Sequence, residues 1–357
     1  MVPARIRQMT PYQHEMPVQE LEREVGVHIA ELGLNENPFG PSPKAVEAIR
    51  GYAQNIDRYP DDTGYYLRLR LAQAFNVSVD QIIIGVGISD LLAMIYQALF
   101  GPDTVALTSE GSFIVYYLLA ATTGMKMVCI PLKNYAYDLD AMAERLTSET
   151  RLIVIANPNN PTGTLIRRKE FEAFMKRVPQ DVLVVVDEAY FEYVSDPAYP
   201  NSFDYLRDGW QVLILRTFSK AYGLAGVRVG FGIGSREVIE TLYKVRMPFC
   251  ASSAGLIAAL AAWDDRDHVE KCVRLNRIEL DFLSRELSAR GVKHVPSHTN
   301  FVFLEIGAFA NQVSTGLLKQ GVLVRPLDGW GLPTAIRVSV GTHEQNLKFL
   351  QALERVL

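Results

Sequence analysis

Short apolar runs alternate with segments of helical pattern between Gln81 and Gly232. Strands are expected at Ile82–Gly85, Val105–Thr108, Met127–Ile130, Leu152–Ala156, Val182–Asp187, Val212–Arg216 and Val227–Gly232. Strands without a polar face that alternate with helices are typical of βαβ units, which form a mostly parallel sheet with helices on both faces. The chain is therefore predicted to be an α/β protein.

After Pro248 the pattern changes to longer helices and shorter strands. Helices are expected at Ala254–Trp263, at His268–Arg290 and from His343, and strands at Asn300–Glu305, Val322–Arg325 and Ala335–Val340. This mixture predicts a smaller α+β domain. We expect an N-terminal arm at 1–40, a large domain at 41–247 and a small C-terminal domain at 248–357, a size that 357 residues with 48% hydrophobic side chains can support.

Composition argues against several classes of protein. The net charge is −4 and no basic patch is present, so no nucleic-acid partner is expected. The longest apolar runs are about half of a membrane span, and no apolar core follows Arg5 and Arg7 as in a signal peptide. Cys129, Cys250 and Cys272 are scattered, which predicts reduced thiols and a cytoplasmic protein.

Metal and hydrolase chemistry are not expected either. His294 and His298 are separated by Pro296, and no acid or cysteine at ligand spacing joins them, so no metal site is predicted. The chain also contains no Gly-x-Ser-x-Gly elbow.

The segment Thr217–Gly230 contains a lone lysine, Lys220, after a strand end rich in hydroxyl groups. A lysine that forms a Schiff base with an aldehyde cofactor must be partly desolvated and lie close to an anchor for the cofactor's anionic tail. Thr217 and Ser219 can donate hydrogen bonds to a phosphate, and Arg228 can pair with it. The alternative is a solvated loop lysine beside a strand arginine.

Two further strand ends carry polar groups. Asn157–Gly163 follows the strand that ends at Ala156, and ligands bind at such carboxyl ends of parallel strands. Asp187 ends another strand, and a buried carboxylate beside a pyridine nitrogen keeps that nitrogen protonated. Tyr190 and Asn160 could then bond the phenolic oxygen of the ring. The alternatives are a plain turn at the first strand end and a helix cap at the second.

Gly85–Asp90 joins a strand to a helix. The third glycine of a dinucleotide-binding turn is absent, and Asp90 stands in its place. A glycine turn at a helix N-terminus suits a single phosphate, so we assign Ile88 and Ser89 to the cofactor phosphate. The alternative is an ordinary turn with a side-chain cap.

Together these segments resemble the pyridoxal-phosphate aminotransferases of the aspartate-aminotransferase fold, from about Thr10 to the C-terminus. The chain is most similar to the histidinol-phosphate aminotransferase family. The resemblance also rests on Thr10-Pro11-Tyr12, Leu34 to Ser42, Arg58-Tyr59-Pro60-Asp61, Val324-Arg325-Pro326 and Ile336 to Thr342. It implies that pyridoxal 5'-phosphate is held by Lys220, and that one strand of the sheet is antiparallel.

The resemblance implies further roles. Phe113 would stack on the cofactor ring, where many relatives carry tyrosine, and Arg337 would bind the substrate carboxylate. Tyr12, Tyr59 and Arg325 would surround the substrate phosphate, with Tyr59 contributed by the partner subunit of a homodimer. Asn35 would be another substrate-binding residue. The alternatives are core packing for Phe113, a surface arginine for Arg337, and no role in the site for Tyr12, Tyr59 and Arg325.

The activity implied is the interconversion of histidinol phosphate and 2-oxoglutarate with imidazole-acetol phosphate and glutamate. Three alternatives stay open at this point. One is an aromatic amino-acid aminotransferase or a biosynthetic paralogue, and another is a decarboxylase of the same fold that acts on a phosphorylated amino acid. The third is a cofactor-sensing regulator, whose DNA-binding segment would find no room before Thr10.

Overall fold

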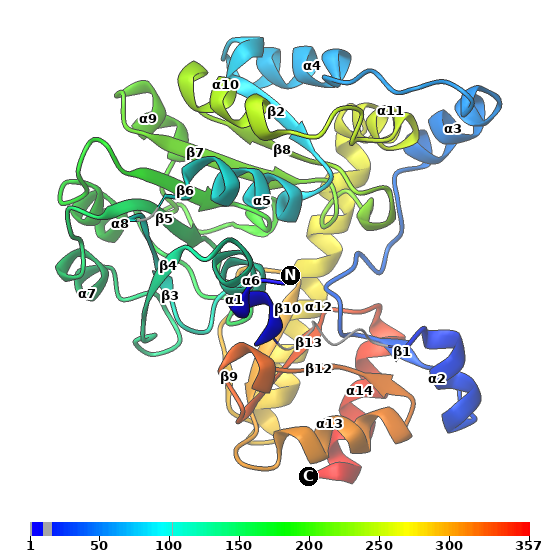
Figure 1. Ribbon diagram of the computed structural model, residues 1–357. Coiled ribbons are helices and arrows are strands. Elements are labelled where there is room, and N and C mark those ends of the chain that lie inside the picture. The colour runs from blue at the N-terminus through cyan, green and yellow to red at the C-terminus, as the bar shows by residue number, and fades with distance from the viewer. Residues whose placement is uncertain (1, 10–15, 102) are drawn as a thin grey trace.

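A seven-stranded sheet forms the centre of the larger part of the molecule (Figure 1). The computed structural model describes residues 2–9, 16–101 and 103–357. The strands are β2 (Ile82–Gly85), β3 (Val105–Ser109), β4 (Lys126–Ile130), β5 (Thr150–Ala156), β6 (Leu183–Asp187), β7 (Val212–Thr217) and β8 (Gly230–Ile233). Their spatial order is β2-β8-β7-β6-β5-β3-β4.

The direction of the strands agrees with the expectation. Every neighbouring pair is parallel except those of β8, which is antiparallel to both β2 and β7. The predicted α/β class and the single antiparallel strand are confirmed. The prediction that β8 starts at Val227 is wrong, because Ala225–Val227 forms a 3-10 turn and Arg228 has a left-handed φ of 58°.

Helices cover both faces of this sheet, as the strand composition predicts. Val185 and Leu213 face a core with α5 (Ile88–Leu99), α6 (Ile114–Thr123) and α10 (Arg236–Val245). Val184 and Ile214 face the opposite core. The helices there are α3 (Pro43–Tyr52), α4 (Tyr65–Phe75), α7 (Leu139–Glu144), α8 (Arg168–Met175), α9 (Ser202–Arg207) and α11 (Ser253–Trp263).

The C-terminal part is built on a second, antiparallel sheet of order β12-β13-β10-β9. Its strands are β9 (His294–Val295), β10 (Phe301–Glu305), β12 (Arg325–Pro326) and β13 (Ala335–Ser339). Its helices are α12 (Arg266–Ala289), α13 (Ala310–Lys319) and α14 (His343–Val356). In Figure 1, α12 runs from beside α11 down to this second sheet, so it connects the two parts.

The N-terminal segment is not wholly irregular. It contains α1 (Ala4–Arg7), α2 (Val18–Val25) and β1 (Ala30–Glu31), and β1 pairs in parallel with β11 (Val322–Leu323). Ala30 and Leu32 lie in the same core as α13 and α14. The division into 1–40, 41–247 and 248–357 stays a prediction, although residues 30–32 pack with the C-terminal part.

Candidate active site

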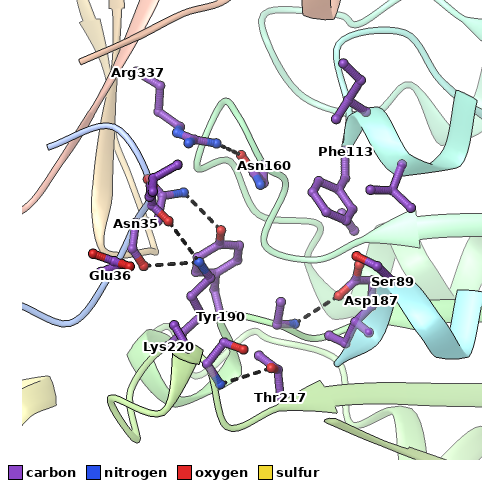
Figure 2. A pocket seen from close by; sticks show the side chains of 18 of the residues that line it. Asn35, Glu36, Ser89, Phe113, Asn160, Asp187, Tyr190, Thr217, Lys220 and Arg337 are labelled. Atoms are coloured by element: carbon purple, nitrogen blue, oxygen red, sulfur yellow. Dashed lines mark hydrogen bonds between the residues drawn. The ribbon is translucent and has the colours of Figure 1, made fainter. Parts of the chain in front are cut away.

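A cavity of about 520 Å³ lies at the carboxyl ends of β5, β6 and β7. Figure 2 shows how its walls come together: Asp187, Thr217 and Lys220 approach from the seven-stranded sheet, and Arg337 approaches from β13. The carboxyl edge of a parallel sheet is the usual place for a ligand, because loops from several strands meet there. The sequence-predicted residues that line this cavity are Asn35, Ile88, Ser89, Phe113, Asn160, Asp187, Tyr190, Thr217, Ser219, Lys220, Arg228, Arg325 and Arg337.

Lys220 follows the end of β7 and extends toward the segment after β1. Its Nζ donates to the carbonyl oxygens of Leu34 and Asn35, both at 3.1 Å. Burial lowers the pKa of this amine to about 7, the positive charges of Arg337 and Arg228 lower it as well, and Glu36 opposes them. The neutral, nucleophilic form of the amine is therefore populated near neutral pH.

Asp187 ends β6 with its carboxylate buried. Its Oδ2 accepts a hydrogen bond from Tyr116 Oη at 2.7 Å, and its Oδ1 accepts from the backbone N–H of Ala189 at 3.1 Å. Burial raises the pKa of this carboxyl to about 6; the two hydrogen bonds lower the pKa, and the charge of Glu188 adds to the rise. A carboxylate fixed by two donors suits a cationic ring nitrogen in the cavity.

Tyr116 is a site residue that the sequence did not indicate. It is fully buried on α6, one helical turn after Phe113. Residues three apart on a helix share a face, so the position of Phe113 was a signal that could have identified it. The ring of Phe113 lies 5.6 Å from that of Tyr116 and 6.1 Å from that of Trp330, which also lines the cavity.

One end of the cavity is a set of hydrogen-bond donors. Ser89 lies in the first turn of α5, whose leading N–H groups have no partner inside the helix. Thr217, Ser219 and Arg228 complete the set, and Arg228 Nη1 is 3.4 Å from Ser219 Oγ. Gly87 has φ 84°, and a Cβ there would lie 2.6 Å from Arg228 Nη2. This cradle fits a phosphate group.

The other end of the cavity carries Arg325 and Arg337. Arg337 Nη1 donates to Asn160 Oδ1 at 2.6 Å (Figure 2), and its Nη2 donates to Gly33 O at 2.7 Å. Arg325 on β12 is the cross-strand partner of Arg337 on β13. Directly opposed residues of an antiparallel pair point to the same face. Both arginines line the cavity, so their guanidinium groups can donate hydrogen bonds to an anionic group of a ligand there.

Asn35 and Tyr190 lie between the lysine and the arginines. Asn35 Nδ2 donates to Tyr190 Oη at 3.0 Å, while Ser339 Oγ donates to Asn35 Oδ1 at 3.0 Å. The expected hydrogen bonds from Tyr190 and Asn160 to a cofactor oxygen stay predictions. Both side chains line the cavity.

Tyr59 is a predicted site residue that does not line the cavity. Tyr59 is 82% exposed and its ring packs on Phe249 at 4.9 Å. Tyr12 lies outside the described residues. A second hollow of about 690 Å³ shares Ile114, Leu118, Arg325 and Trp330 with the first, so space continues beyond the arginines.

Within the described ranges, no group of three or more histidine, cysteine, aspartate or glutamate side chains could hold a metal ion. Over the same part of the chain, the helices are too short or too polar to cross a bilayer.

Comparison with known proteins identifies the family. The model of the class I and II aminotransferases matches residues 27–353. Histidinol-phosphate aminotransferase 1 of Nitrosococcus oceani is 42% identical over 355 residues, which cover 99% of this chain and 96% of that protein. Histidinol-phosphate aminotransferase of Moorella thermoacetica is 41% identical over 99% of this chain and 92% of its own length.

Solved structures agree with this result. Histidinol-phosphate aminotransferase from Sinorhizobium meliloti, in complex with pyridoxal-5'-phosphate, superposes with a TM-score of 0.90 at 30% identity, over 99% of this chain and 97% of that one. An aspartate aminotransferase variant from Thermus thermophilus has a TM-score of 0.86 at 24% identity, over the whole of both chains, and shows the fold alone.

Proposed function

The chain belongs to the class I and II aminotransferases, and from this premise we propose that it transfers an amino group between histidinol phosphate and 2-oxoglutarate. The products are imidazole-acetol phosphate and glutamate. The observation that carries the proposal is the pair of opposed arginines, Arg325 and Arg337, at the end of the cavity opposite the phosphate cradle. The names of relatives about 40% identical over nearly the whole chain support the same substrate.

The cavity has the groups that pyridoxal 5'-phosphate requires. Ser89, Thr217, Ser219 and Arg228, with the N–H groups at the start of α5, would hold the phosphate. Lys220 would hold the aldehyde group of the cofactor. When bound, this cofactor supplies a protonated pyridine ring that withdraws electrons from the amino-bearing carbon of the substrate.

Lys220 also moves the proton of the reaction. Its Nζ lies in the cavity, where it would act as a base toward the substrate carbon. A base with a pKa near the working pH is the most effective, and the Nζ pKa of about 7 meets that condition. Tyr190, held by Asn35, and Asn160, held by Arg337, line the wall between this amine and the arginines.

Asp187 holds the proton at the ring nitrogen, and Tyr116 positions Asp187. Each carboxylate oxygen accepts one protein donor, which fixes the plane of the carboxylate and leaves lone pairs directed to the cavity. Phe113 lines the cavity and would stack on the ring. Phenylalanine serves as well as tyrosine there, because stacking uses only the ring face.

The substrate's anionic groups lie at the arginines. The guanidinium of Arg337 is oriented by Asn160, by Gly33 O and by the rings of Phe301 and Trp330, each 5.4 Å from its Cζ. Its planar donors match a carboxylate, and Arg325 provides a second cation for the substrate phosphate. Tyr12 and Tyr59 complete the phosphate pocket.

The active form is a homodimer with shared sites. The large exposed apolar side chains Ile56, Tyr59, Tyr65, Tyr66, Met247 and Phe249 come from two segments. Asp62 joins these segments, because its carboxylate pairs with Arg246 at 2.8 Å and accepts from the Phe249 N–H. An exposed apolar patch of this kind indicates an interaction surface. A second copy of the chain covers it and receives Tyr59 in its cavity.

The protein acts in the cytoplasm. Its three cysteines are free thiols, which is the usual state in a reducing compartment.

The substrate is tested by kcat/KM for histidinol phosphate and for phenylalanine, in the wild type and in Arg325→Ala. A hydrogen bond to a charged group contributes about 1.5–3 kcal/mol, so the variant should use histidinol phosphate roughly ten- to a hundredfold less well. Phenylalanine use should change little. Arg355→Ala, on the exposed side of α14, is the matched control.

Equal losses for the two donors would overturn the phosphate assignment and favour an aromatic amino-acid aminotransferase. One observation supports that second candidate: the apolar side chains Ile114, Leu118 and Trp330 line both hollows, where an aromatic ring would fit.

A further inference from the structure

A buried ion pair lies directly behind the cavity. Glu188 follows Asp187 at the end of β6, and Arg216 precedes Thr217 at the end of β7. Both charged side chains are almost fully buried. Because side chains alternate along a strand, Arg216 lies on the face of Ile214, opposite to Thr217.

The pair joins the two strands by several contacts. Arg216 Nη2 and Nε lie 2.7 and 2.8 Å from Glu188 Oε2. Ser202 Oγ donates to the other oxygen of Glu188 at 2.6 Å, and the Glu188 N–H donates to Leu215 O at 2.9 Å. The guanidinium Cζ lies 3.5 Å from the centre of the Phe191 ring. Both members are therefore fixed in one geometry.

Stability alone does not account for such a pair. Removing two charges from water is costly, and well-packed apolar residues of similar volume often stabilise a protein as well or better. What the pair adds is geometry, because it sets how the end of β6 lies against the end of β7. In this register Asp187 is opposite Leu215, two residues before Thr217.

The neighbours of the pair make that geometry important. Asp187 would hold the ring nitrogen of the cofactor, and Thr217 lies in the cradle that would hold its phosphate. These two groups belong to one small ligand and are joined by a planar ring and a short arm, so a shift of one strand against the other would misplace one of them.

We propose that Glu188 and Arg216 are positioning residues, a brace that keeps β6 and β7 at the spacing that the two ends of pyridoxal phosphate require. The inference rests on the proposed function, because it assumes this cofactor. Neither residue lines the cavity, so the brace acts through Asp187 and Thr217.

The test separates an effect on the stability of the protein from an effect on the spacing of β6 and β7. Arg216→Met, Glu188→Leu and the double variant are compared with the wild type in two measurements: the urea midpoint of the cofactor-free protein, and the dissociation constant for pyridoxal phosphate. Each single variant removes the main partner of a buried charge and should lower the midpoint. Glu192 also faces Arg216 and loses this cation when Arg216 is replaced, so the midpoint should recover in large part, though not in full, in the double variant. Its affinity for the cofactor should nevertheless fall by roughly tenfold or more, since small misplacements of binding groups have effects of this size.

Leu353→Ala, in the core of the C-terminal part, is the control. It should lower the midpoint and leave cofactor affinity unchanged. A double variant that recovers both the midpoint and wild-type affinity would overturn the brace. If the double variant does not fold, Arg216→Lys replaces it in the test. Wild-type affinity of this variant for pyridoxal phosphate would overturn the proposal. Weaker cofactor binding at an unchanged urea midpoint would support it. A wild type that does not bind pyridoxal phosphate would contradict the proposed function itself.

Discussion

The ε-amino group of Lys220 is a base whose surroundings favour its neutral form. Burial, Arg337 and Arg228 lower its pKa to about 7, against about 10.4 for a lysine in water. In the cofactor-free protein, labelling by an amine-reactive reagent should therefore rise with pH to a midpoint near 7 at Lys220. Peptide mapping isolates the curve of Lys220, and a blocked lysine labelled under the same conditions is the reference, with a pKa of about 10.4. A Lys220 midpoint near that of the reference would remove Lys220 from its proposed role as a base.

The role of the Tyr116 hydroxyl can be tested by removing its one oxygen atom. Tyr116→Phe removes the donor to Asp187 Oδ2 and leaves the Ala189 N–H. A donor to the charged form lowers a carboxyl pKa, so its loss should raise the pKa of Asp187 further and move the acid limb of the kcat profile to higher pH. A hydrogen bond to a charged group is worth about 1.5–3 kcal/mol, so kcat should fall roughly tenfold or more.

Tyr96→Phe is the matched control for that change. Tyr96 is also fully buried, and its hydroxyl has no hydrogen-bond partner among the described residues. Its loss should leave the pH profile unchanged. A Tyr116→Phe profile that coincides with the control would mean that the hydroxyl only fills space.

At the scale of elements, the turn from β2 into α5 makes a prediction about cofactor affinity. Gly87 has a left-handed φ, and Gly87→Ala would place a methyl group against the guanidinium of Arg228. An alanine with a left-handed φ costs about 1–2 kcal/mol of stability at any position. At position 87 the added methyl group would also displace Arg228, which is part of the phosphate cradle. Cofactor affinity, measured by equilibrium dialysis, should fall by at least about tenfold. Gly26→Ala, equally left-handed but with open space around it, should lose stability and keep affinity.

The elements that the sequence predicted best are the apolar parallel strands, because burial on both faces leaves a continuous apolar run. Polar residues stand out where such a run ends, and this contrast indicated Asp187 and Lys220. The predicted start of β8 was wrong because Arg228 adopts a left-handed conformation, which residue type does not reveal. The expected strand at Val322–Arg325 is divided between β11, which pairs with β1, and β12, which pairs with β13. Tertiary pairing made that division, and no local pattern encodes it.

At the scale of the whole molecule, the site depends on contacts between distant segments. Arg337 meets Asn160, and Asn35 meets Tyr190, across more than a hundred residues in each case. The family resemblance indicated these residues, but their hydrogen-bond partners follow only from packing of the two sheets. Trp330 ends a short 3-10 helix between β12 and β13 and had no sequence signal, since its place at the cavity comes from the strands on either side.

The proposed sharing of sites between two subunits gives a prediction about mixed dimers. If Tyr59 serves the partner's cavity, Lys220→Ala and Tyr59→Ala dimers should each be nearly inactive with histidinol phosphate. After unfolding and refolding together, a hybrid has one site with both substitutions and one with neither. Random pairing makes half of the dimers hybrids, so about a quarter of the sites, and of wild-type activity, should return. Sedimentation confirms dimers, and the two variants mixed without refolding are the control. No recovery in confirmed hybrids would place Tyr59 outside the partner's site.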